Sequence, residues 1–157
     1  VWDALVASGR SLELQPIGLG ARDILRLEAG MPLYGNEINL EIDPLEADLG
    51  FGLDMEKDAV GIPALRERKA AGIARHAISL AADGGRVVRP GATLHLPDGP
   101  QIGFVTSGGV SPTLGKNIAR GLVSAEHGAE GATLEAEIRG KRQPLQVVPS
   151  PFYKRAR

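Results

Sequence analysis

Apolar and polar positions follow different patterns in the two halves of the chain. Up to about residue 72, apolar residues recur at spacings of three and four, which is typical of α-helices. From residue 75 onward, apolar and polar residues alternate in short runs between turn residues, which is typical of β-strands. We therefore predict two parts, a mixed first part over residues 1–72 and a β-rich second part over residues 73–157.

The first part is expected to be largely helical. The pattern predicts helices over residues 2–8, 21–29 and 61–72, and short strands over 12–17 and 49–53. Gly30 directly follows the second helix and is a suitable C-terminal cap. The first residues resemble the interior of an amphipathic helix without an initiator methionine, so we expect the chain to be a segment of a longer protein.

The second part is expected to form a small antiparallel β-barrel or sandwich. Six short strands are predicted over residues 77–81, 93–96, 101–107, 120–123, 134–138 and 145–148. Glycine-rich turns separate them, and many short strands at this spacing favour a closed or two-layered β fold. The fold class predicted for the whole chain is therefore α+β.

The composition excludes some classes of function but does not identify one. The hydrophobic fraction of 43% is sufficient for a packed core, and the formal net charge of −1 argues against nucleic acid or an anionic membrane as a partner. No apolar run reaches the length of a membrane span. Cysteine is absent, which excludes disulfides and thiolate catalysis and fits a reducing compartment.

Several common catalytic patterns are missing. His76, His95 and His127 are far apart in sequence, so we predict no metal site. No Gly-x-Ser-x-Gly elbow accompanies the serines, and those near Ser107 are expected to bind backbone groups in a loop over residues 107–117. A cluster of acidic residues is expected to form a solvated face: Glu28, Glu37, Glu41, Asp43 and Glu46.

Arg22 is the residue with the clearest potential for binding. It lies in the first turn of the second predicted helix, after a glycine turn, where the helix dipole disfavours a cation. A ligand carboxylate would bind its guanidinium in bidentate geometry. An internal ion pair, of Arg22 with a distant acid or of Asp23 with Arg26, is an equally good interpretation from these residues alone. The same turn fails as a dinucleotide fingerprint, because Asp23 stands where the third glycine is needed.

Three longer stretches resemble one family. They are GLGARDILRLEAGMPLYGNE over residues 18–37, TSGGVSPTLGKNIA over residues 106–119, and EIRGKR over residues 137–142 followed by Pro151-Phe152-Tyr153. In order and over nearly the whole chain, these stretches resemble the aminomethyltransferase, or T-protein, of the glycine cleavage system.

The resemblance implies a reaction and a fold. Such proteins transfer a one-carbon unit from the aminomethyl-lipoyl arm of H-protein to tetrahydrofolate and release ammonia. Three domains surround a central folate site, and the last domain is a barrel of jelly-roll character. This chain would hold the tail of the folate-binding α/β region and that C-terminal barrel.

The resemblance also assigns residues. Arg22 matches the arginine that faces the folate, whereas Met31 stands where some members have a tyrosine. Arg26, Glu28 and Tyr34 belong to the same motif and are interpreted as structural. The family's catalytic aspartate lies in the N-terminal half, so no catalytic residue is assigned here and the chain alone is expected to be inactive.

Tetrahydrofolate as co-substrate, lipoylated H-protein and the missing N-terminal part of the enzyme are the expected partners, without metal, nucleic acid or membrane. The expected location is the cytoplasm, or the mitochondrial matrix in a eukaryote. Two alternatives stay open. One is a folate-dependent demethylase or another T-protein-like folate enzyme, and the other is a non-catalytic binding module.

Overall fold

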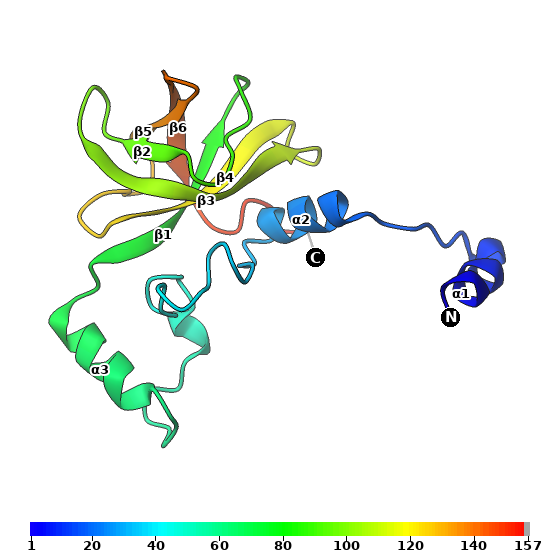
Figure 1. Ribbon diagram of the computed structural model, residues 1–157, viewed down its shortest axis with the longest axis horizontal. Helices are drawn as coiled ribbons and strands as arrows, with labels where there is room; N and C mark the ends of the chain where they lie inside the picture. Colours follow the sequence, from blue (N-terminus) through cyan, green and yellow to red (C-terminus); the bar gives the residue numbers. More distant parts are fainter. Residues whose placement is uncertain (156–157) are drawn as a thin grey trace.

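Six antiparallel strands form a closed barrel in the second part of the chain (Figure 1). The computed structural model describes residues 1–155. The strands are β1 (Arg75–Ala82), β2 (Thr93–His95), β3 (Gln101–Ser111), β4 (Lys116–Ser124), β5 (Thr133–Ile138) and β6 (Lys141–Val148). Their order around the barrel is β1-β4-β3-β2-β5-β6, and β6 pairs with β1 to close it. The predicted antiparallel barrel and the α+β class are therefore confirmed.

The barrel is filled by side chains from every strand. Its core includes Leu80, Leu94 and Leu134, which are fully buried or nearly so. Gly121 in β4 leaves room for this packing, because a Cβ at this position would lie 2.5 Å from Cδ1 of Leu94. The alternation of inward and outward residues that marks a strand thus produces one continuous core inside the closed sheet.

The topology explains how short strands close. Strands β2, β3 and β4 follow one another as antiparallel neighbours. A long connection over residues 83–92 joins β1 to β2, and β1 lies beside β4 in the barrel. This is a Greek-key arrangement, which is common in antiparallel barrels and sandwiches. Closure leaves no free sheet edge, and an unpaired edge is a site of aggregation.

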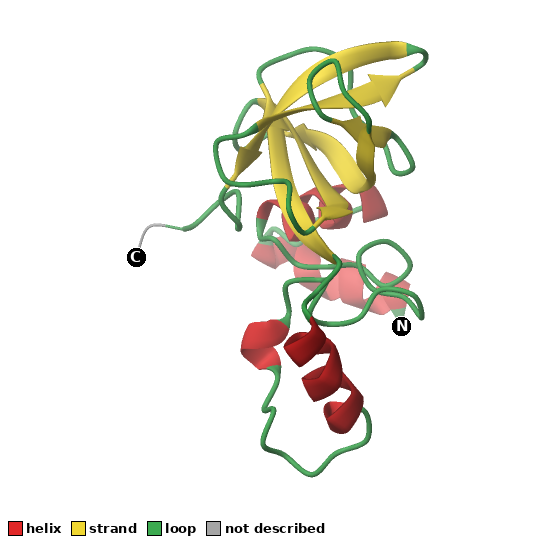
Figure 2. Cartoon of the chain, turned by 90° about the vertical axis from the view of Figure 1, so that its left-hand side faces the viewer, coloured by secondary structure: helices red, strands yellow, loops and turns green. Residues whose placement is uncertain are grey.

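The first part consists of helices joined by irregular segments (Figure 2). The elements are α1 (Trp2–Gly9), the 3₁₀ turn η1 (Arg10–Leu12), α2 (Leu19–Glu28), the 3₁₀ turn η2 (Gly50–Gly52) and α3 (Ile62–Ala71). Helix α2 lies against the barrel, whereas α1 stands apart at the end of an extended segment (Figure 1). No helix within residues 1–155 is long and apolar enough to cross a membrane.

Two short strands predicted in this part are wrong. Residues 12–17 contain the end of η1 and then irregular chain, because no neighbouring strand in the described residues pairs with them. Residues 49–53 form η2, in which the Gly52 amide donates to the Leu49 carbonyl over 3.0 Å. The segment with alternating apolar residues and glycines therefore forms a local turn instead of a strand in a sheet.

The loop predicted over residues 107–117 is also wrong. Strand β3 continues to Ser111 and β4 begins at Lys116, with Gly108 paired to Ala119 across the ladder. The run of Ser and Gly residues resembles a loop in sequence, but pairing with β4 keeps it extended. The division between residues 72 and 73 stays a prediction, since α2 and the barrel are in direct contact.

Large apolar side chains are exposed mainly in the first part. They include Trp2, Leu5, Leu12, Ile17, Leu19, Leu25, Met31, Tyr34, Leu40, Phe51 and Val60. Scattered exposed apolar residues are normal, but so many over one part of a chain are typical of a surface that another polypeptide covers.

We predict that Leu94→Ala destabilises the protein by about 3 kcal/mol, because it removes a fully buried side chain at the barrel centre and leaves a cavity. The free energy of unfolding from urea denaturation measures this effect. Leu40→Ala is the matched control, since Leu40 is 97% exposed and its loss should change stability by under about 0.5 kcal/mol. Equal effects of the two substitutions would contradict the assigned core.

Candidate functional site

The end of α2 is fixed by backbone geometry. The Met31 amide donates to the Arg26 carbonyl over 2.8 Å, and the Gly30 amide donates to the Leu27 carbonyl over 2.9 Å. These two bonds form a Schellman motif, in which the residue after the helix takes a left-handed conformation. Gly30 has a φ of +69°, so glycine is needed there. The predicted cap at Gly30 is thereby observed, and the chain turns back toward the barrel.

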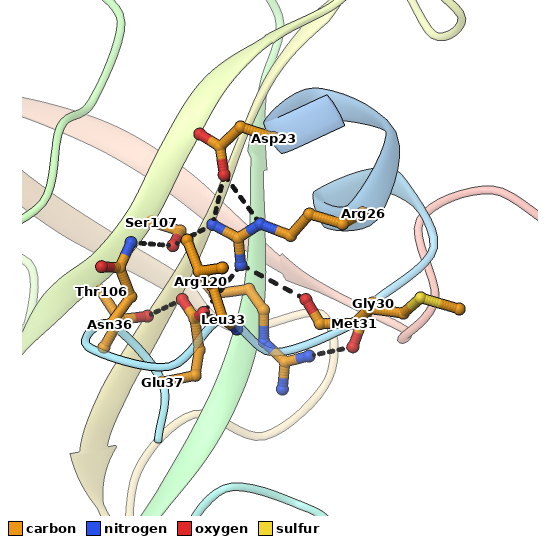
Figure 3. Close-up of polar contacts among 10 residues, drawn as sticks. All are labelled: Asp23, Arg26, Gly30, Met31, Leu33, Asn36, Glu37, Thr106, Ser107 and Arg120. Carbon is orange, nitrogen blue, oxygen red and sulfur yellow. Dashed lines mark hydrogen bonds and ion pairs between the residues drawn. The ribbon is translucent and has the colours of Figure 1, made fainter. Parts of the chain in front are cut away.

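Arg26 is the centre of a buried polar network (Figure 3). Its side chain is 8% exposed, and its guanidinium donates to Glu37 over 2.7 Å, to Ser107 over 2.7 Å and to Asp23 over 2.8 Å. Nη1 also reaches the Met31 carbonyl over 3.3 Å. One side chain thus connects α2, the segment after it and strand β3. We call Arg26, Glu37 and Ser107 the clamp.

Glu37 accepts bonds from three directions. Besides Arg26, the Thr106 hydroxyl donates to it over 2.7 Å and the Leu33 amide over 3.0 Å. Burial raises the pKa of Glu37, but the hydroxyls of Ser107 and Thr106, the Leu33 amide and the Arg26 charge outweigh burial and lower the pKa overall. The carboxylate is therefore held in its charged form inside the protein.

Strand β3 is shaped to receive α2. Gly109 leaves room for α2, because a Cβ at this position would meet the end of the Ile24 side chain. At the next turn, Glu28 is 3% exposed and accepts hydrogen bonds from the hydroxyls of Ser111 and Thr113. The Ser111 hydroxyl also accepts a hydrogen bond from the Leu114 amide over 3.0 Å, as the sequence predicted for a serine that binds backbone groups. Its bond to a helix side chain was not predicted.

A second ion pair ties the irregular segment to the start of the barrel. Arg75 Nε donates to Glu46 over 2.8 Å, and the Ala77 amide donates to the Glu46 carbonyl over 2.7 Å. The hydrogen bond with Glu46 raises the pKa of Arg75, and burial opposes it. Glu46 is 1% exposed.

The prediction of a solvated acidic face is therefore wrong for three of its five members. Glu28, Glu37 and Glu46 are buried with partners, while Glu41 is exposed and Asp43 is half-buried. Helical or strand periodicity gave no signal for this, because each of the three buried acids has at least one partner on a distant barrel strand. The structural role expected for Arg26 and Glu28 agrees with their contacts, but Tyr34 is 72% exposed.

Arg22 lies one turn before Arg26 on α2. Its side chain is exposed and makes no hydrogen bond or ion pair with the rest of residues 1–155. Of the two internal pairs considered for this helix, only that of Asp23 with Arg26 forms, at 2.7 Å. The exposed guanidinium of Arg22 therefore belongs to a helix that the clamp holds in place.

The histidines do not converge. His95 is 8% exposed and contacts Thr93 over 2.9 Å and Arg142 over 3.1 Å, while His127 lies 3.5 Å from Glu126. Within the described part of the chain, no group of three or more His, Cys, Asp or Glu residues has the spacing to hold a metal ion.

We predict that Glu37→Gln destabilises the protein by about 3 kcal/mol at pH 7, because it leaves Arg26 buried without its charged partner. The pKa of Glu37 is lowered from 4.5, so its charge stabilises the fold fully above pH 4.5 and progressively less as the pH falls through the folded-state pKa. The free energy of unfolding, measured by urea denaturation from pH 7 to pH 3, should show the two proteins converging in acid.

The control for this pH series is Glu41→Gln. Glu41 has an exposed side chain, so its substitution should leave both the stability and its pH dependence nearly unchanged. A difference between the native and Glu37→Gln proteins that stays constant down to pH 3 would contradict the lowered pKa.

Two family models match the chain. The glycine cleavage T-protein C-terminal barrel domain matches residues 75–154, and the GCVT N-terminal domain matches residues 1–57. The first match covers the whole barrel from the beginning of β1, and the second covers α1, α2 and the clamp residues of the first part.

Individual proteins give the same result. The chain is 47% identical to an aminomethyltransferase of Desulfitobacterium hafniense and 44% identical to one of Geobacillus thermodenitrificans, over 99% and 100% of its length. It covers only 42% and 43% of those two relatives. The crystal structure of the glycine cleavage system aminomethyltransferase T from Bartonella henselae superposes with a TM-score of 0.84 at 34% identity, covering 94% of this chain and 44% of that one. The chain therefore belongs to the glycine cleavage T-protein family and corresponds to the C-terminal part of its members.

Proposed function

We propose that this chain is the C-terminal part of an aminomethyltransferase of the glycine cleavage system. The intact enzyme would move a one-carbon unit from aminomethyl-lipoyl H-protein to tetrahydrofolate and release ammonia. The observation that carries this proposal is Arg22, an exposed arginine without a side-chain partner in residues 1–155, on a helix fixed by the clamp, in a chain of this family. We place the reaction in the cytoplasm, or in the mitochondrial matrix of a eukaryote, as the family resemblance implies.

Arg22 would bind the carboxylate end of tetrahydrofolate. A guanidinium offers two parallel N–H donors to a carboxylate and stays charged at every physiological pH. Helix α2 is held by buried contacts at its C-terminal end, so its backbone is already ordered and only the Arg22 side chain would lose conformational freedom on binding. In this role Arg22 positions one substrate, and much of the rate enhancement would come from bringing two substrates together.

The remaining parts of the active site would come from the rest of the enzyme. The chain spans less than half the length of the relatives that it matches. The family resemblance implies that the catalytic aspartate lies in the N-terminal half, outside this chain. Exposed apolar side chains of the first part, such as Trp2, Leu5 and Leu12, fit a surface that the N-terminal part covers. We therefore propose that the chain alone has no turnover, and that H-protein binds only the assembled enzyme.

Two other functions are separable by experiment. A folate-dependent demethylase would share the fold and the arginine, and a panel of methylated amine substrates tested on the full-length enzyme distinguishes it. A non-catalytic binding module is favoured by one observation, since the barrel has its own closed core. Stable folding of residues 73–157 without any response to folate would support that role for the barrel itself.

We predict that Arg22→Ala in the full-length enzyme weakens tetrahydrofolate binding or turnover at least about tenfold, which corresponds to the loss of one charge-assisted hydrogen-bond pair. Steady-state kinetics with varied tetrahydrofolate measure the effect, and Arg22→Lys should recover only part of it. Lys57→Ala, an exposed cation outside the site, is the control. An unchanged apparent constant for tetrahydrofolate in Arg22→Ala would overturn the assignment of Arg22.

A further inference from the structure

A second arginine is buried without a charged partner. Arg120, in β4, is 3% exposed, and Nη1 donates to the Gly30 carbonyl over 2.6 Å. Nε is buried and has no hydrogen-bond partner, and no carboxylate within residues 1–155 forms an ion pair with this guanidinium. Figure 3 shows one nitrogen of the side chain bound to the Gly30 carbonyl. An unpaired buried cation is costly, so a missing partner needs an explanation.

A second unpaired group lies beside it. Ser79 on β1 is the cross-strand partner of Arg120, and its buried hydroxyl also has no hydrogen-bond partner. Both residues line a cavity of about 210 Å³. These are the two orphaned buried side-chain polar atoms in the described part of the chain, and they belong to paired residues. Their coincidence indicates one site rather than two separate packing faults.

A larger and mainly apolar cavity adjoins the first. This second cavity, of about 400 Å³, shares Arg120, Asp48 and Ser150 with the first. Its walls are mainly apolar and include Met31, Pro32, Leu49, Phe51 and Pro151. Together the two cavities are lined by a cation, a hydroxyl and several apolar side chains, which is the usual composition of a pocket for a small organic ligand.

The geometry of the guanidinium selects the ligand. With Nη1 occupied by Gly30, the free edge of Arg120 is formed by Nε and Nη2, and this edge binds a carboxylate through two parallel bonds. Two exposed acids, Asp48 and Glu130, also line the smaller cavity without pairing with Arg120. Their negative charges disfavour ligands with several charges, such as phosphates or dicarboxylates.

We propose that Arg120 and Ser79 form a binding site for a monocarboxylate carried on an apolar body. The carboxylate would lie on the Nε–Nη2 edge and accept a third bond from the Ser79 hydroxyl, and the apolar body would fill the larger cavity beside Phe51. This site is separate from the proposed role of Arg22, because Arg22 lines neither cavity. The carboxylate could belong to a free small acid or to a glutamate side chain between apolar residues of another polypeptide.

Nuclear magnetic resonance of the 157-residue chain tests the site directly. The signal of the Arg120 side-chain Nε–Hε group is followed while benzoate is added, and Arg120→Met identifies that signal. We expect a saturable shift with benzoate and none with benzamide, which has the same shape without the charge. Ser79→Ala should weaken benzoate about fivefold through the loss of one hydrogen bond, and Asp48→Asn should strengthen it.

Two comparisons make the outcome decisive. The blocked peptide N-acetyl-Phe-Glu-Phe-amide is titrated in parallel. A shift with benzoate alone assigns a free acid, and a shift with the peptide assigns a protein segment. If neither shifts the Nε–Hε signal, or benzamide acts as benzoate does, the site is filled by solvent and the proposal is overturned. It is also overturned if Asp48→Asn moves the signal without ligand as far as benzoate does in the native chain, since Asp48 would then be the partner.

Discussion

The buried ion pair between Arg26 and Glu37 fixes where α2 lies on the barrel. Its two charges come from the end of the helix and from the segment that follows, and the third member, Ser107, belongs to strand β3. Separating these charges inside the protein would cost several kcal/mol. The helix, the returning chain and the strand are therefore held in a single relative position, and the other contacts of the first part form around it.

The sequence around the clamp is adapted to this position. Gly109 leaves room for the end of the Ile24 side chain on α2, and Gly30 allows the chain to reverse directly after the helix. Glu28 adds a second polar attachment to β3 through Ser111. Because α2 is a rigid helix attached at its C-terminal end, the clamp also determines where Arg22 stands, one turn earlier.

The barrel could be predicted from the sequence because the alternation of apolar and polar residues that marks each strand is a local pattern. Alternating residues and glycine turns identified all six strands, and the arginine motif in α2 was found from the helix spacing and the family resemblance. The ends of β3 and β4 were missed, since Gly108 and Ser111 resemble loop residues until pairing with β4 is known.

The buried acids were missed for a related reason. A glutamate such as Glu37 has the same local pattern whether it is solvated or paired, and its partners Thr106 and Arg26 lie on different elements. Only the three-dimensional contacts distinguish the two states. The free donors of Arg120 could not be predicted either, because their lack of a partner depends on the packing of β1 against β4.

The central claim is that the clamp positions Arg22 for folate. A double-mutant cycle in the full-length enzyme tests it, with the dissociation constant of tetrahydrofolate measured for Arg26→Met, Arg22→Ala and the double variant. If the claim holds, Arg26→Met weakens binding when Arg22 is present and has little further effect in the Arg22→Ala background. Equal weakening by Arg26→Met in both backgrounds would show that the clamp acts on the fold alone and would contradict the account.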